Sequence, residues 1–140
     1  MAGRKTIEHW LAEYSRSHQN PLNRALHTVC VPAILFASVA LLWDPRLAGV
    51  RAAYLMMILV APFYLRLGLR ALAIMAVQFA ACVLLLCLWP RAIALRPAAI
   101  VMFVLAWIGQ FIGHAIEGRR PKFFQDLSFL LIGPLWVVLK

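Results

Sequence analysis

Long apolar runs alternate with short polar segments along most of the chain, a pattern typical of membrane-spanning helices. We predict four spans, which are separated by polar or proline-containing turns: 22–43, 47–65, 71–89 and 98–116. A last apolar run, 123–139, contains Gln125, Asp126 and Pro134, and it fits a fifth span, a re-entrant helix or a surface helix. The pattern predicts an all-α fold, a single membrane domain over residues 1–140 built as a helical bundle.

The first polar stretch, residues 6–19, has the periodicity of an amphipathic helix. Thr6 suits the N-cap, and one helical face carries the larger apolar and aromatic side chains, which are Ile7, Trp10, Leu11, Tyr14 and His18. That face is expected to lie on the membrane surface or against the body of the protein. Pro21 is expected to end or kink this helix.

Composition agrees with a membrane protein. Hydrophobic residues make up 64% of the chain and charged residues 14%, whereas a soluble domain has about a quarter charged residues. The net charge of +9 does not indicate nucleic-acid binding, because the basic residues lie between apolar blocks and form no stripe. Membrane lipid is therefore the expected surrounding, and no nucleic-acid partner is expected.

The basic residues also predict orientation, because cytoplasmic loops are enriched in lysine and arginine. With four spans and a cytoplasmic N-terminus, the inner side holds nine: Arg4, Lys5, Arg16, Arg24, Arg66, Arg70, Arg119, Arg120 and Lys122. The outer side holds four: Arg46, Arg51, Arg91 and Arg96. The N-terminus is thus predicted to be cytoplasmic, in the inner membrane of a bacterium or the endoplasmic reticulum of a eukaryote. The start of the first span and the end of the fourth then lie on one side.

Polar residues gather at those two places. Trp107, Gln110, His114 and Glu117 share one helical face, as do Asn20, Asn23 and His27, and Tyr14 and His18 are one turn apart in the preceding helix. Such side chains are costly in lipid, so we expect them to face the bundle interior. Three imidazoles and a carboxylate suit iron, zinc or another transition metal.

We take His18, His27 and His114 as candidate ligands. Glu117, as a fourth ligand or a base, and Tyr14 are the candidate catalytic residues, and Asn20, Asn23 and Gln110 are expected to orient the ligands. Two other interpretations stay open. One is a haem protein with His27 and His114 as axial ligands. The other is a non-catalytic membrane adaptor whose polar stripes hold helices together.

Two motifs resemble those of the 2-hydroxy fatty acid dioxygenase family. The first is His18-Gln19-Asn20-Pro21-Leu22-Asn23 with His27 and Val31-Pro32, and the second is Trp107-Ile108-Gly109-Gln110-Phe111-Ile112-Gly113-His114 with Glu117 and Arg119-Arg120-Pro121. Gln19 and Lys122 depart from the family pattern.

The resemblance implies an Fe(II)-dependent membrane dioxygenase of fatty acid alpha-oxidation. Such an enzyme uses O2 to convert a 2-hydroxy fatty acid to the acid one carbon shorter, and by motif its iron ligands correspond to His18, His27 and His114. Arg24, Arg119 and Arg120 are candidates to bind the substrate carboxylate. The sequence leaves the oligomeric state open.

Overall fold

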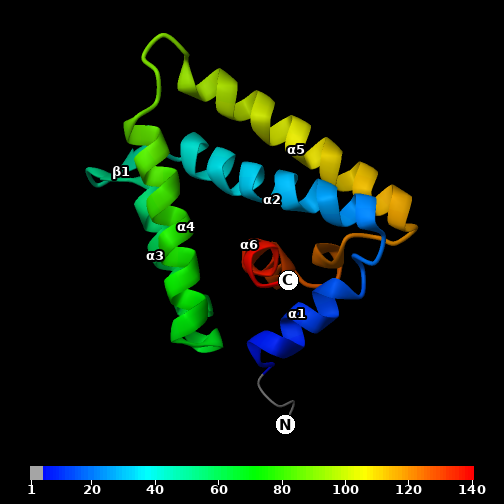
Figure 1. Cartoon of the computed structure of the whole chain (residues 1–140). Helices are drawn as coiled ribbons and strands as arrows, with labels where there is room; N and C mark the ends of the chain where they lie inside the picture. Colours follow the sequence, from blue (N-terminus) through cyan, green and yellow to red (C-terminus); the bar gives the residue numbers. More distant parts are fainter. Residues whose placement is uncertain (1–4) are drawn as a thin grey trace. The chain divides into compact units, whose positions relative to one another are not determined.

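The computed structural model describes residues 5–140, and its helices confirm the predicted all-α class (Figure 1). The elements are α1 (Ile7–Ser15), α2 (Pro21–Leu41), β1 (Arg46–Leu47), β2 (Val50–Arg51), α3 (Ala52–Leu67), α4 (Leu69–Cys87), α5 (Leu95–Glu117), the 3-10 helix η1 (Lys122–Phe124) and α6 (Ser128–Leu139). Arg4, which the charge count includes, lies outside the described residues.

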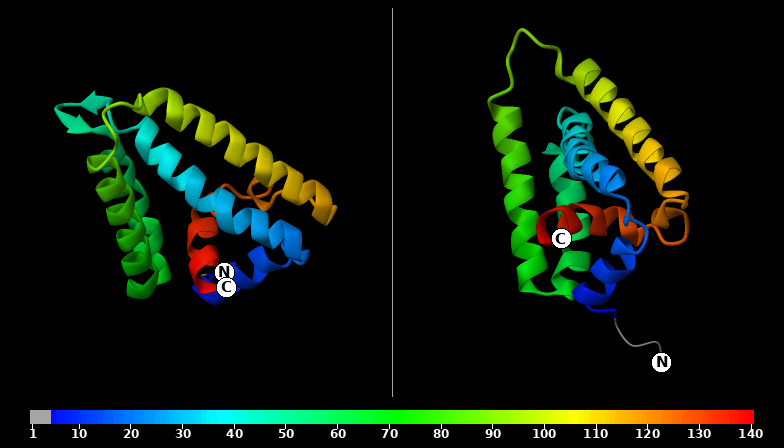
Figure 2. Two further views of the ribbon diagram at one scale, coloured as in Figure 1. Left: turned by 45° about the horizontal axis from the view of Figure 1, so that its top comes forward. Right: turned by 45° about the vertical axis from the view of Figure 1, so that its right-hand side comes forward.

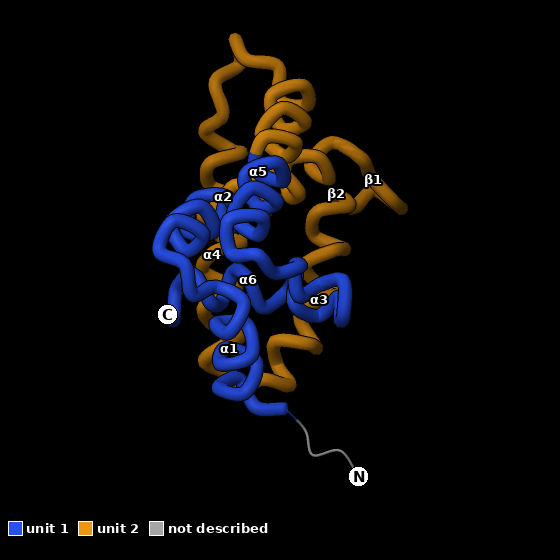
Figure 3. The backbone as a smooth tube through the Cα atoms, turned by 90° about the vertical axis from the view of Figure 1, so that its right-hand side faces the viewer, with its two compact units in different colours: residues 1–32, 106–140 blue, residues 33–105 orange. Residues whose placement is uncertain are grey.

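The chain divides into two compact units (Figure 3). One comprises residues 5–32 and 106–140, and we call it the histidine unit because all four histidines belong to it. The other comprises residues 33–105, and we call it the apolar unit. Helices α2 and α5 each contribute residues to both units. The division within α2 falls at Pro32, a proline inside the helix, where the backbone N–H of a normal helical residue is missing.

Three helices are long and apolar enough to cross a membrane: α2, α4 and α5. Their bounds agree with the first, third and fourth predicted spans to within three residues. The second predicted span, 47–65, is not supported as a span by length. Helix α3 has 16 residues and is about 24 Å long, whereas a hydrocarbon core is about 30 Å thick. Four spans are therefore not established.

Helix α3 begins late because residues 46–51 form a hairpin. Strands β1 and β2 pair antiparallel, and the turn between them places Ala48 and Gly49 at positive φ. The Arg51 guanidinium donates a hydrogen bond to the Trp43 carbonyl oxygen at 2.6 Å and lies over the Trp43 ring. These contacts keep the first residues of the predicted span out of the helix.

The apolar unit is built on the α3–α4 pair, whose helices run side by side and join at Gly68 (Figures 1 and 2). Its buried cluster consists of small and aliphatic side chains: Val39, Ala40, Ala53, Cys82, Leu86 and Ala99. Small residues at these positions let helix backbones approach closely, which is how helices associate in an apolar solvent.

In the histidine unit, α1 packs against α6. The Trp10 and Phe129 rings meet edge to face with their centroids 4.9 Å apart, so the apolar face predicted for residues 6–19 lies against protein. The Thr6 side chain caps α1 as predicted, but the helix ends at Ser15 rather than residue 19. Helix α6 has 12 residues, about 18 Å, which is too short for the fifth span that 123–139 allowed.

Candidate metal centre

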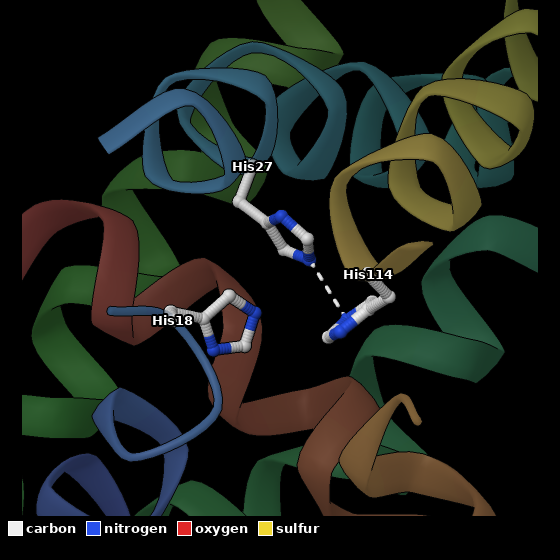
Figure 4. Close-up of side chains that lie close together, drawn as sticks. All are labelled: His18, His27 and His114. Carbon is white, nitrogen blue, oxygen red and sulfur yellow. Dashed lines mark hydrogen bonds between the residues drawn. The ribbon is translucent and has the colours of Figure 1, made fainter. Parts of the chain in front are cut away.

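Three histidines distant in sequence converge in the histidine unit (Figure 4). His18 lies in the turn between α1 and α2, His27 lies in the second turn of α2, and His114 lies near the end of α5. Their ring centroids are 4.2 to 5.0 Å apart, and one ligand nitrogen from each ring lies within 4.8 Å of the other two. All three side chains are buried. The structure thus brings together the three imidazoles that the sequence predicted to converge.

Backbone carbonyls orient two of the rings. The Nδ1 of His18 lies 2.7 Å from the Tyr14 carbonyl oxygen, and the Nδ1 of His27 lies 3.0 Å from the Asn23 carbonyl oxygen. A carbonyl oxygen only accepts, so each Nδ1 carries the proton and each Nε2 presents a lone pair. This is the usual arrangement of a metal-binding histidine, whose other ring nitrogen donates to a carbonyl or carboxylate.

The lone-pair nitrogens have few protein partners. Among residues 5–140, the buried Nε2 of His18 and Nδ1 of His114 have no hydrogen-bond partner. The Nε2 of His27 lies 3.2 Å from the Nε2 of His114. A transition metal bound at about 2.1 Å by three imidazoles in tetrahedral geometry needs nitrogens about 3.4 Å apart. The three ligand nitrogens lie within 4.8 Å of one another, so modest side-chain movements bring them into range and the residues present fit a metal ion.

Burial keeps the His18 imidazole neutral. Burial lowers the pKa of His18 from 6.5 to about 4, and the nearby His114 adds to this, although the Tyr14 carbonyl opposes it. Burial also raises the pKa of the Tyr14 phenol above its usual range. Neutral imidazole is the form that binds a metal, so His18 is ready to bind one at neutral pH.

Aromatic rings enclose His18. Tyr14 stacks on it with ring centroids 4.3 Å apart and planes at 7°, and the Trp136 ring lies at 5.0 Å. Trp136 is almost fully buried, and its indole N–H donates to the Ser15 hydroxyl at 2.8 Å. The prediction included Tyr14 but missed Trp136. The only signal was a tryptophan in an apolar run, which does not identify its partner.

Asn23 and Gln110, two predicted supporting residues, are buried beside the rings. The Asn23 amide donates to the Ser17 carbonyl oxygen at 3.3 Å, and Gln110 lies within interaction distance of His27. Gly113 allows Asn23 this position, because a Cβ on residue 113 would collide with the Asn23 Oδ1. Close approach of α2 and α5 thus depends on a residue without a side chain.

Glu117 and Asn20 lie beside the three histidines without belonging to the ligand group. The Glu117 carboxylate accepts from the backbone N–H groups of Gln19 and Asn20, at 2.9 and 2.8 Å, and from the Asn23 amide at 3.1 Å. The Asn20 side chain accepts from the N–H of Leu22 at 2.9 Å, at the start of α2.

The three arginines predicted to bind a carboxylate differ in their surroundings. All three are exposed. Arg24 lies on α2, three residues before His27, and its positive charge contributes to the lowered pKa of His18. The Arg119 guanidinium donates to the Arg16 carbonyl oxygen at 2.8 Å, and Arg120 lies in the turn after α5.

Comparison with known proteins identifies the family of this chain. The family described as 2-hydroxy-palmitic acid dioxygenase Mpo1-like matches residues 4–140. The 2-hydroxy-palmitic acid dioxygenase MPO1 of Saccharomyces cerevisiae is 28% identical over 132 residues, which cover 91% of this chain and 75% of the yeast protein. No solved structure matches. Because the family match spans nearly the whole chain, the protein belongs to the Mpo1-like family of 2-hydroxy-palmitic acid dioxygenases.

Proposed function

We propose that this protein is a membrane-embedded, Fe(II)-dependent dioxygenase that shortens 2-hydroxy fatty acids by one carbon. The observation that carries the proposal is the set of three buried imidazoles, two of them oriented by carbonyl oxygens, with ligand nitrogens within 4.8 Å of one another. Family membership supports the dioxygenase class. Apolar helices are consistent with a membrane setting, and the predicted inner-face location of the site stays part of the proposal.

Three neutral histidines would hold the iron: His18, His27 and His114. Bound there, Fe(II) supplies the one-electron and O2 chemistry that protein side chains lack. The histidines leave coordination positions open, and a 2-hydroxy acid offers a carboxylate and a hydroxyl that chelate a metal. Arg24, which lies on α2 three residues before His27, is the arginine that we expect to orient that carboxylate.

The proposed reaction needs no external reductant. RCH(OH)COOH and O2 give RCOOH, CO2 and H2O, so carbon, hydrogen and oxygen balance. The hydroxy acid loses four electrons and O2 accepts four. The expected stoichiometry is one O2 consumed for each shortened fatty acid.

The third imidazole argues against a haem protein. Bis-histidine haem needs a porphyrin plane between the axial rings, but the His18 ring lies 4.2 Å from His27 and 5.0 Å from His114 by centroid. If the protein is a non-catalytic adaptor, the polar residues only stabilise helix packing, and neither bound metal nor oxygen uptake is expected. The metal analysis and oxygen-uptake assay described next therefore test this alternative as well.

The test is metal analysis combined with oxygen uptake on a 2-hydroxy fatty acid, using the full chain purified in detergent. We expect one bound iron, activity that chelation abolishes and Fe(II) restores, and a raised KM in Arg24→Gln. His9→Ala is the matched control, because His9 is exposed on α1. Protein that binds no metal, or activity that survives complete removal of iron, would refute the proposal.

A further inference from the structure

Glu117 joins the end of one helix to the start of another. It is the last residue of α5, one turn beyond His114. Its two carboxylate oxygens accept three hydrogen bonds, and all three donors belong to the segment Gln19–Asn23. This side chain therefore ties the element that carries His114 to the segment that immediately follows His18.

His18 needs such a tie more than the other two ligands do. His27 and His114 are held by helical backbone, whereas His18 lies between the end of α1 at Ser15 and the start of α2 at Pro21. The same segment is held again at Arg16, whose carbonyl oxygen accepts from the Arg119 guanidinium at 2.8 Å. Both contacts come from the end of α5 and the turn after it, so the position of His18 relative to His114 depends on them.

The charge of Glu117 suits this structural task. Hydrogen bonds from backbone N–H groups to a carboxylate are stronger than those to a neutral acceptor, and an anion beside a helix N-terminus is favourable. A glutamine has one acceptor oxygen with two lone pairs, which cannot serve three donors. Glu117→Gln therefore leaves at least one donor of the segment without its acceptor.

We infer that Glu117 is a positioning residue that holds His18 in register with His114, rather than a fourth metal ligand or a general base. The inference rests on the proposed metal centre for its consequence. Residues that orient a ligand in this way typically change metal affinity by about 10- to 100-fold when they are lost. The inference thus predicts weaker metal binding with an unchanged ligand set.

The experiment compares wild type, Glu117→Gln and Asn23→Ala, each as the full chain in detergent. Glu13→Gln is the control, because Glu13 lies on α1 and its carboxylate forms an ion pair with Lys5 at 3.0 Å, outside the group of three candidate ligands. Co(II) titration measures affinity and its visible absorption spectrum reports the ligand set, while amide hydrogen exchange of metal-free protein reports the 16–20 segment. We expect about 10- to 100-fold weaker Co(II) binding in Glu117→Gln, an unchanged spectrum at saturation and faster exchange at residues 19 and 20.

Asn23→Ala removes one of the three donors, so a smaller change in the same direction is expected. The double variant should fall short of the sum of the two, because both residues act on one contact. A changed Co(II) spectrum at saturation would overturn the inference by making Glu117 a ligand, and so would unchanged affinity and exchange. If wild type binds no metal while Glu117→Gln still accelerates exchange, the proposed function fails and the positioning of the segment stands.

Discussion

The histidine unit and the apolar unit bury different kinds of side chain. Six serine, histidine and amide side chains are buried within the described residues, and every one belongs to the histidine unit: Ser17, His18, Asn23, His27, Gln110 and His114. The buried cluster of the apolar unit contains no charged or amide side chain. Burying a polar group is costly unless it has a partner, so a concentration of such groups in half of the molecule points to a ligand rather than to stability.

The outer surfaces of the apolar unit fit a lipid environment. Large aliphatic side chains such as Leu59, Val77 and Leu84 are exposed along α3 and α4. A soluble monomer rarely exposes so much contiguous apolar surface. Apolar side chains such as Val29 and Leu127 are exposed on the histidine unit as well, so the two units differ in what they bury rather than in what they expose. Four predictions test that difference.

The largest effect is expected from the ligands themselves. His27→Ala or His114→Ala should abolish metal binding and lower kcat/KM by about 1000-fold or more, because the remaining two imidazoles cannot hold the ion. Metal content and oxygen uptake check this. His9→Ala should retain both properties, and wild-type metal content in either ligand variant would contradict the assignment.

A core substitution in the apolar unit should lower stability and leave metal binding unchanged. Leu86 is 5% exposed, and Leu86→Ala is expected to lower the free energy of unfolding by about 2–5 kcal/mol through the cavity it leaves. Metal affinity should stay within twofold of wild type. Thermal unfolding in detergent and Co(II) titration measure the two quantities, and a large loss of affinity would show that the units do not differ as described.

Acid should destabilise the metal-free protein through the histidine unit. The pKa of His18 is about 4 in the folded protein and 6.5 ordinarily, so the unfolded chain binds the proton first. The contribution of neutral His18 to the free energy of unfolding is therefore fully present above pH 6.5. It is lost as the pH drops toward 4, by an amount on the order of 3 kcal/mol. Unfolding measured across this range should be less pH-dependent in His18→Asn, and equal slopes would contradict the prediction.

The smallest effect tests the close approach of α2 and α5. Gly113→Ala places a Cβ against Asn23, and we expect a loss of about 1–3 kcal/mol together with weaker metal binding. Gly109→Ala in a Cys30→Ala background is the matched control, because Cys30 Sγ, at 2.6 Å, is the neighbour that its Cβ would meet. Equal stability and equal metal affinity in the two variants would show that Gly113 has no special role in the site.

Local patterns in the sequence predicted much of the fold. Apolar run length predicted α2, α4 and α5 closely, and the Thr6 cap marked the start of α1, because helix formation depends on neighbours within a turn or two. The predicted start of the second span, residue 47, was wrong because the Ala48–Gly49 turn pairs β1 with β2. Hydropathy along the chain gives no information about such a pairing.

The sequence by itself determined which candidate site residues the chain offers and on which helical faces they lie, since spacing sets direction on a helix. It predicted His18, His27 and His114 as a set, and their convergence was confirmed. Only tertiary structure decided what each face meets. Trp136 reaches His18 from a distant segment, and the Glu117 carboxylate is taken up by the N–H groups of Gln19 and Asn20. Such pairings depend on how helices pack, and periodicity within one helix carries no information about its partner.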